Sequence, residues 1–327
     1  MGQFYDEIPE THIAWIKKQE MFFVATAPLS ADGHVNVSPK GVRDSFHVES
    51  RSRVWYEDLS GSGIETISHL KENKRITIMF CALEGAARIL RIWGTGRVFE
   101  FGTPEYEELI PSEKRMTGSR AAIVVDVHKV GTSCGYAVPI YTFKSHRSAL
   151  LTWSEKMEKL DEDFAADPTA CPHGPEALPV SPTSPGSAPY SAFFSFSSRS
   201  ISDPSEHAGA TTRAYAKRSM KWWWAGWNLR SIDGLPGLDT AHVVDAVPRM
   251  GEEAKRGLKA QGAAPEPPSD GTVVILGNRV SRAGRWEAAL GRLTPASGEE
   301  AVRLVLACSL GMAIAAICLG VVGMGTC

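Results

Sequence analysis

A short stretch rich in glycine and serine, SGSG at residues 60–63, has the residue types of an anion-binding loop. It runs into GIETISHLKE, residues 63–72, which has the composition of a short helix, with Ser62 placed to cap its first turn. The first N–H groups of a helix have no acceptor within the helix and can bind an anion. The hydroxyls of Ser62 and Thr66 would add two donors. A capped helix behind a flexible loop is the structural alternative, and the residues by themselves leave both interpretations open.

The framework that would position this loop is predicted to be a set of β-strands. Apolar and β-branched segments alternate with Gly, Asp and Ser turns, and Asp32-Gly33 is a strong hairpin signal. Several strands this close, with one or two short helices, predict a mainly β fold, a closed or partly closed antiparallel barrel. A doubly wound α/β sheet needs strand–helix alternation and a glycine loop after its first strand, and neither is present. The predicted strands are residues 21–29, 34–41, 45–50, 53–59, 75–83, 88–101 and 121–130.

Composition and charge argue against several classes of function. Lysine and arginine number 35 against 37 acidic residues, so the net charge of −2 provides no positive field for nucleic acid. The six cysteines are scattered without a CxxC motif, which argues against a disulfide framework. Cys171 and His173 have no second pair at metal-ligand spacing, so we predict no metal site. The N-terminus lacks the apolar region of a secretory signal.

The segment LVLACSLGMAIAAICLGVVGM, residues 304–324, contains no charged residue. As a helix it would rise about 31 Å, which is the thickness of a bilayer core. We therefore predict a transmembrane tail anchor that leaves the preceding domain in the cytoplasm. The whole protein would be cytoplasmic if this helix does not insert. A buried hydrophobic helix is the structural alternative.

Two further stretches lie between the strands and this tail. Residues 166–212 are rich in Pro, Ser and Ala, and they cannot bury enough apolar surface to offset their ordering entropy, so we predict disorder. The stretch is either a true insertion or a gene-model artefact such as a translated intron. In KWWWAGWNLRSIDGLPGL, residues 221–238, Trp223 and Trp227 share one face of a helix. A packed helix is favoured over an anchor at the membrane interface.

Several motifs in a fixed order resemble a known family. FFVATAPLSADGHVNVSPKG, WYEDLSGSGIETISHLKENKRITIMF and RILRIWGTGRV resemble the FMN-binding split β-barrel of pyridoxamine-phosphate-oxidase-like flavoproteins, and SCGYAVP and NLRSIDGLPGL resemble its fungal group. The resemblance implies a homodimer with FMN in a groove between the subunits. The predicted domains are then the split barrel (1–160), a disordered insertion (161–212), a C-terminal segment of the barrel domain (213–240), a low-complexity linker (241–303) and the transmembrane helix (304–324).

The resemblance also implies which residues contact FMN. The second strand of the family lays its backbone along the isoalloxazine edge, and Lys40 would stabilise the negative charge of the reduced flavin. A solvated lysine in a polar turn is the alternative. Arg88 and Arg91 lie three apart on a strand and hence on opposite faces, and Arg88 is favoured for the FMN phosphate. The implied cofactor-binding residues are Val37, Ser38, Pro39, Lys40, Ser60, Ser62, Gly63, Thr66 and Arg88.

Two departures separate the chain from pyridoxamine-phosphate oxidases proper. Their Arg-Lys pair at the start of the helix is replaced here by Glu65 and Thr66, and their C-terminal pattern of Trp with Arg and His is missing. The expected function is therefore an FMN-dependent oxidoreductase that acts on an unidentified small molecule. The electron chemistry would belong to the cofactor, so no catalytic residue is predicted. The alternatives are a non-catalytic flavin- or cofactor-binding module tethered to a membrane, and a membrane-tethered interaction protein with an empty barrel.

Overall fold

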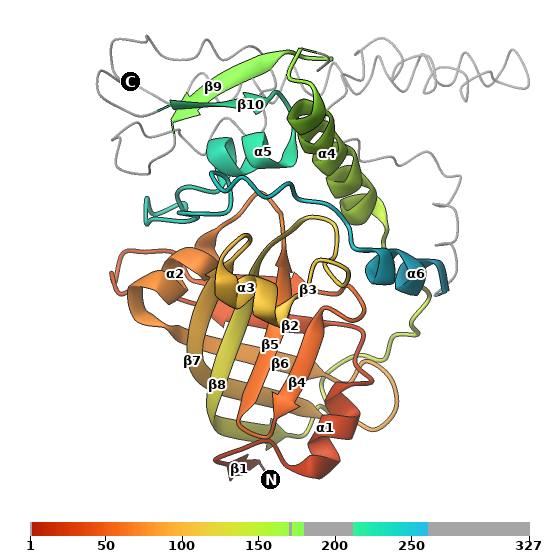
Figure 1. Cartoon of the computed structure of the whole chain (residues 1–327). Helices are drawn as coiled ribbons and strands as arrows, with labels where there is room; N and C mark the ends of the chain where they lie inside the picture. The colour runs from red at the N-terminus through yellow and green to blue at the C-terminus, as the bar shows by residue number, and fades with distance from the viewer. Residues whose placement is uncertain (1, 170–171, 180–211, 261–327) are drawn as a thin grey trace, which may run out of the picture. The chain divides into compact units, whose positions relative to one another are not determined.

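The computed structural model describes residues 2–169, 172–179 and 212–260 (Figure 1). The helix predicted at 304–324 lies outside the described residues. Among those that are described, no helix combines the length and apolar character needed to cross a membrane. The described strands are β1 (Gln3–Tyr5), β2 (Phe22–Thr26), β3 (Asn36–Lys40), β4 (Phe46–Ser50), β5 (Arg53–Leu59), β6 (Arg75–Cys81), β7 (Ile89–Glu100), β8 (Ser119–Ser133), β9 (Pro175–Pro179) and β10 (Thr212–Ala216). The described helices are α1 (Glu10–Ile16), α2 (Glu65–Asn73), α3 (Pro104–Leu109), α4 (Ala149–Ala166), α5 (Met220–Trp227) and α6 (Glu252–Ala260).

The first eight strands form one antiparallel sheet in the order β3-β2-β6-β7-β8-β5-β4, with β1 paired to β8. The sheet curls until strands that are not neighbours pack across its interior, as Figure 1 shows. Phe22 of β2 lies 4.9 Å from Phe46 of β4 and 5.4 Å from Tyr56 of β5, measured between ring centroids. Alternate Ile, Val and Phe side chains fill this interior, as expected for strands with one buried face. The predicted mainly β split barrel is confirmed.

Helix α2 packs against β2 and β7. The contact is close because Gly96 has no side chain: a Cβ there would lie 2.5 Å from Cδ2 of Leu70. The predicted capping of this helix by Ser62 is wrong. The helix begins at Glu65, its N-cap is Ile64, and no side chain caps it. The N–H groups of the first turn are therefore left for another partner.

A second layer consists of α4, α5, β9 and β10. The packed helix predicted from the tryptophan run is confirmed by α5, in which the ring centroids of Trp223 and Trp227 are 5.5 Å apart. Trp153 of α4 lies 5.1 Å from Trp223. Trp224 is fully buried and packs on Phe101 of the barrel domain, with ring centroids 5.8 Å apart. The helix that contains the tryptophan run therefore packs against the barrel.

Two predicted boundaries differ from the described structure. Residues 161–166, assigned to the disordered insertion, are the end of α4, and Pro175–Pro179 forms β9, which pairs with β10. Composition missed β9 because its hydrogen-bonding partner lies more than thirty residues away in the chain. In the predicted linker, Ala241 and His242 are fully buried and α6 follows them. Residues 170–171 and 180–211 of the predicted insertion and 261–303 of the predicted linker lie outside the described residues.

Candidate functional site

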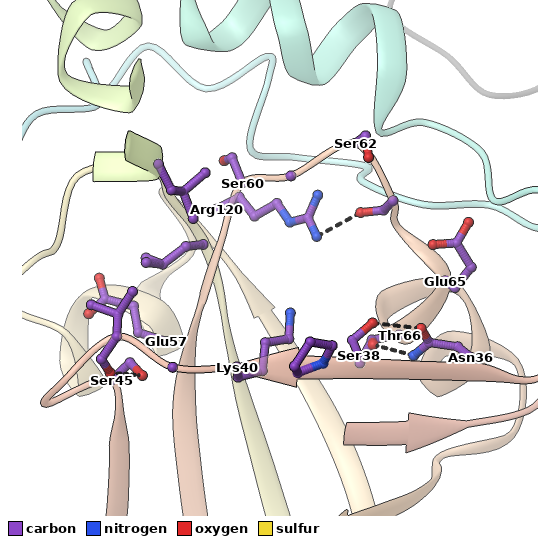
Figure 2. A pocket seen from close by; sticks show the side chains of 17 residues that line it. Asn36, Ser38, Lys40, Ser45, Glu57, Ser60, Ser62, Glu65, Thr66 and Arg120 are labelled. Carbon is purple, nitrogen blue, oxygen red and sulfur yellow. Dashed lines mark hydrogen bonds between the residues drawn. The ribbon is translucent and has the colours of Figure 1, made fainter. Parts of the chain in front are cut away.

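A cavity of about 320 Å³ lies between β3, the loop 60–63 and the first turn of α2 (Figure 2). Its volume is within the range of small-molecule sites in proteins. Strand β3, which lies at the edge of the sheet, supplies some of the lining residues, and the loop that directly follows β5 supplies others. Arg120 enters from β8, which pairs with β5 so that Asp58 stands opposite Ala121. Three segments distant in sequence thus meet around one space.

One wall of the cavity is a buried ion-paired group. Asp58 is fully buried and binds two cations, with Lys40 Nζ at 2.7 Å from Oδ1 and Arg120 Nε at 2.9 Å from Oδ2. Burial by itself would raise the pKa of the Asp58 carboxyl, but the charges of Lys40 and Arg120 and their hydrogen bonds lower it below its usual value. Asp58 therefore stays ionised, and the two cations are held at fixed positions with a net charge of +1.

The neighbouring carboxyl, Glu57, is in a different environment. It lines the cavity, is nearly fully buried, and accepts a 2.8 Å hydrogen bond from the backbone N–H of Met116. Burial raises the pKa of Glu57, while hydrogen bonds from Ser119 and Met116 and the charge of Arg115 act against that rise. A carboxyl of this kind keeps its proton to higher pH than an exposed glutamate.

A network of hydroxyl and amide groups joins β3 to α2 (Figure 2). Ser38 Oγ donates to Asn36 Oδ1 at 2.8 Å, and Asn36 Nδ2 donates to Thr66 Oγ1 at 2.9 Å. Behind them Thr26 Oγ1 is 2.9 Å from Nδ1 of the buried His69. These hydroxyl and amide groups, at one end of the cavity, carry no charge and can both donate and accept hydrogen bonds.

The first turn of α2 adds a negative charge to that end. Glu65 lines the cavity, and its Oε1 accepts a hydrogen bond of 3.3 Å from the backbone N–H of Ile232. The uncapped N–H groups of the helix attract an anion, whereas the Glu65 carboxylate repels one. The cavity thus has an ion-paired cationic wall and a hydroxyl-rich end that carries one carboxylate.

Comparison with known proteins identifies a family for part of the chain. Residues 8–134 match the family described as pyridoxamine 5'-phosphate oxidase. Over 143 residues the chain is 44% identical to the pyridoxamine 5'-phosphate oxidase family protein ustO of Aspergillus flavus. The domain formed by this segment belongs to the pyridoxamine 5'-phosphate oxidase family. The match to ustO covers 43% of this chain and 57% of that protein, so the chain spans little more than half the length of this relative.

Solved structures with a similar chain trace include HupZ of Group A Streptococcus, at 23% identity and a TM-score of 0.32 over 38% of this chain and 99% of that chain. A protein named as FMN-binding, from Syntrophomonas wolfei, aligns at 12% identity and a TM-score of 0.27 over 39% and 82%. A protein named as FAD-binding, from Mycobacterium smegmatis, aligns at 12% identity and a TM-score of 0.28 over 39% and 97%. Scores this low add no argument about the function of this chain.

Most of the residues predicted from the family resemblance meet at the cavity. Those that line it are Ser38, Pro39, Lys40, Ser60, Ser62, Gly63 and Thr66. Val37 is not among them and is 62% exposed, because side chains alternate along a strand and it faces away from Ser38. Arg88 is not brought to the cavity either. Its guanidinium lies over the ring of Trp15 in α1, 5.4 Å from the centroid.

The cavity also contains residues that the sequence analysis did not assign. Asn36 had a usable signal, since the period of two puts it on the same face as Ser38 and Lys40. Arg120 and Glu57 had no such signal, because only the pairing of β5 with β8 places them.

A second cavity of about 470 Å³ shares Glu57 with the first and includes Trp55. Among the described residues no group of three His, Cys, Asp or Glu is placed to hold a metal ion.

Proposed function

We propose that this family member is an FMN-dependent oxidoreductase that acts on a small molecule. The observation that carries the proposal is the cavity between β3 and the loop 60–63, in which a fixed cationic wall faces a hydroxyl-rich end. Bound FMN would supply the electron transfer. The chain would therefore have to bind and orient FMN and the substrate and to exclude water, rather than provide a nucleophile.

The cationic wall fits the electron-rich edge of a flavin ring. Lys40 Nζ uses one donor for Asp58 and has two others, and its side chain is 23% exposed. A fixed cation beside the ring would favour its reduced, negatively charged form. Arg120 is less free, because it already donates to Asp58, to Asn228 Oδ1 and to Gly63 O. Lys40 is therefore the residue we assign to the ring, with Arg120 holding it in place through Asp58.

The other end of the cavity fits a polyhydroxyl chain that ends in a phosphate. The hydroxyl of Ser38 and the amide of Asn36 match the alternating donors and acceptors of a ribityl chain. The uncapped N–H groups of α2 and the hydroxyl of Thr66 would receive the phosphate. Glu65 opposes the phosphate and would weaken its binding. Glu57 is the group in the cavity wall best suited to hold a proton near the ligand, because burial raises its pKa.

Flavin binding by the full-length chain tests this proposal. The purified protein should show flavin absorbance or take up FMN, and it should bind FMN more tightly than riboflavin. Thr66→Ala removes one hydrogen bond and should weaken FMN binding by about three- to tenfold, with riboflavin binding almost unchanged. Arg88→Ala is the matched control and should change neither affinity. Equal losses for the two ligands in Thr66→Ala would contradict the phosphate assignment, and a chain that binds neither flavin would end the proposal. Bleaching of bound flavin by NAD(P)H would distinguish turnover from a binding module.

Two further proposals concern assembly and location. We propose a homodimer, which is supported by exposed apolar side chains on β3 and after β8, among them Val37, Tyr136 and Ile140. Light scattering of the purified chain would contradict it by giving a monomer mass.

We also propose that residues 304–324 anchor the chain in a membrane, because the run has no charged residue. Release of the full-length protein by alkaline carbonate would contradict the anchor.

A further inference from the structure

The loop 60–63, which lines the cavity, is held from its other side by α5. Trp224 is fully buried, and its indole Nε1–H donates to Ser60 Oγ at 2.7 Å. Ser60 Oγ in turn donates to Gly118 O at 2.6 Å, and the backbone N–H of Ser60 donates to the same carbonyl. The hydroxyl and the backbone N–H of Ser60 are therefore held in a buried hydrogen-bond network, and buried networks of this kind hold one geometry.

The next peptide of the loop is fixed in the same way. The carbonyl oxygen of Gly61 accepts from Trp223 Nε1 at 3.1 Å and from Asn228 Nδ2 at 3.2 Å. Asn228 is itself fully buried and accepts from Arg120 Nη1 through its Oδ1 at 2.9 Å. One side chain thus joins the loop to the cationic wall. The two hydrogen bonds to the Gly61 carbonyl each join residues more than 160 positions apart in the sequence.

The orientation of this carbonyl decides where the following amide points. In a planar trans peptide, the C=O of one residue and the N–H of the next point in opposite directions. Because the Gly61 carbonyl is turned toward α5, the N–H of Ser62 is turned away from that helix. Figure 2 shows the loop running between α5 above and the cavity below. The Ser62 N–H therefore faces the cavity.

We propose that Trp223 and Trp224 are positioning residues of the cavity, whose indole N–H groups turn the loop 60–63 so that the Ser62 amide faces the ligand. The inference rests on the proposed function for the identity of that ligand, a flavin. It gives the tryptophan run a role beyond packing. It also explains why the segment after the insertion belongs to the site, since the cavity needs a helix encoded on the far side of that insertion.

The helix offers a matched control for this proposal. Trp222 is also partly buried and also donates its indole N–H, but to Glu176 Oε2 at 3.0 Å, away from the loop. Trp→Phe keeps an aromatic ring and removes only the N–H donor and part of the ring system. Comparing Trp223→Phe with Trp222→Phe therefore separates the hydrogen bond to the loop from a general loosening of α5.

The first measurement needs no ligand. Hydrogen–deuterium exchange of the full-length chain should show peptides covering residues 60–66 exchanging about three- to tenfold faster in Trp223→Phe and Trp224→Phe, as expected for the loss of one hydrogen bond. Trp222→Phe should leave those peptides unchanged. Equal exchange in all variants would overturn the positioning role, whether or not the protein binds a flavin. If Trp224→Phe does not fold, the partly buried Trp223→Phe still decides.

The second measurement uses FMN. Trp223→Phe should raise the FMN dissociation constant by about three- to tenfold, and Trp222→Phe should not raise it. In a double-mutant cycle, Trp224→Phe should have little further effect on FMN affinity once Ser60 is replaced by alanine, because it acts through that residue. A loosened loop with unchanged FMN affinity would overturn the inference. Failure of the wild-type chain to bind any flavin would refute the proposed function, and the exchange result would still test the loop.

Discussion

The carboxyl groups around the cavity have two different kinds of partner. At the cationic wall, Asp58 is completely buried and lies between two cations, Lys40 and Arg120. Elsewhere around the cavity, Glu57 and Glu65 accept hydrogen bonds from neutral groups, the backbone N–H groups of Met116 and Ile232. The first carboxylate is needed by its partners, whereas the other two add charge that the cavity has to tolerate. The difference separates a group that maintains the framework from groups that respond to a ligand or a proton.

The largest effect is expected from removing the carboxylate of Asp58. Asp58→Asn would leave Lys40 and Arg120 close together without their shared counter-charge, and breaking a buried pair in this way costs about 3–5 kcal/mol of unfolding free energy. Asp126→Asn is the control, since Asp126 also pairs with two arginines, Arg53 and Arg97, but is 44% exposed. Its loss should cost less than about 1 kcal/mol. Urea denaturation measures both, and similar losses would contradict the comparison.

The ion pairs of Asp58 also make the stability of the protein depend on pH. The pKa of Asp58 is lowered in the folded protein relative to its usual 3.8, so the unfolded chain binds the proton more readily. The stability that Asp58 contributes is therefore complete above about pH 3.8 and is lost as the pH falls through the lower folded value. Asp58→Asn should flatten the acid side of the stability profile.

A smaller effect, on ligand affinity, is expected at the hydroxyl-rich end. Glu65→Gln removes a negative charge next to the proposed phosphate position and should tighten FMN binding by about tenfold, with riboflavin changed by less than about twofold. Glu72→Gln serves as the control, because Glu72 lies on the same helix but accepts from the backbone N–H of Leu29 instead. Fluorescence titration distinguishes the two ligands. Equal tightening of FMN and riboflavin would show that no phosphate lies beside Glu65.

The smallest effect on stability is expected at Glu57. Glutamine can keep the hydrogen bond from Met116, and it removes a charge that burial disfavours, so Glu57→Gln should change the unfolding free energy by less than about 1 kcal/mol at neutral pH. The pKa of Glu57 is raised in the folded protein, so its contribution is present below its usual 4.5 and is lost as the pH rises through the folded value. Thermal melting across that window measures the slope, which should be smaller in Glu57→Gln. An unchanged slope would contradict the raised pKa.

The sequence by itself determined the strands and the loop. Alternation along the strands and the turn residues between them are local signals, and all the barrel strands except the short β1 lie within a few residues of their predicted bounds. It also identified Lys40 and the loop 60–63, because both belong to continuous motifs. The N-terminal signal of α3 was available but not used: Thr103 caps that helix through its side chain and Pro104 follows.

Only the tertiary structure decided which charges meet. Arg88 immediately precedes β7 and Arg120 lies in β8, and strand alternation gives at most the face of each residue, not which end of the sheet it occupies or what lies beside it. The pairing of β5 with β8 brings Arg120 to Asp58, 62 residues away in the sequence, and leaves Arg88 beside Trp15. The docking of α5 similarly brings Trp224 to Ser60, 164 residues away. Such contacts depend on packing between distant segments, and no local pattern in either segment encodes them.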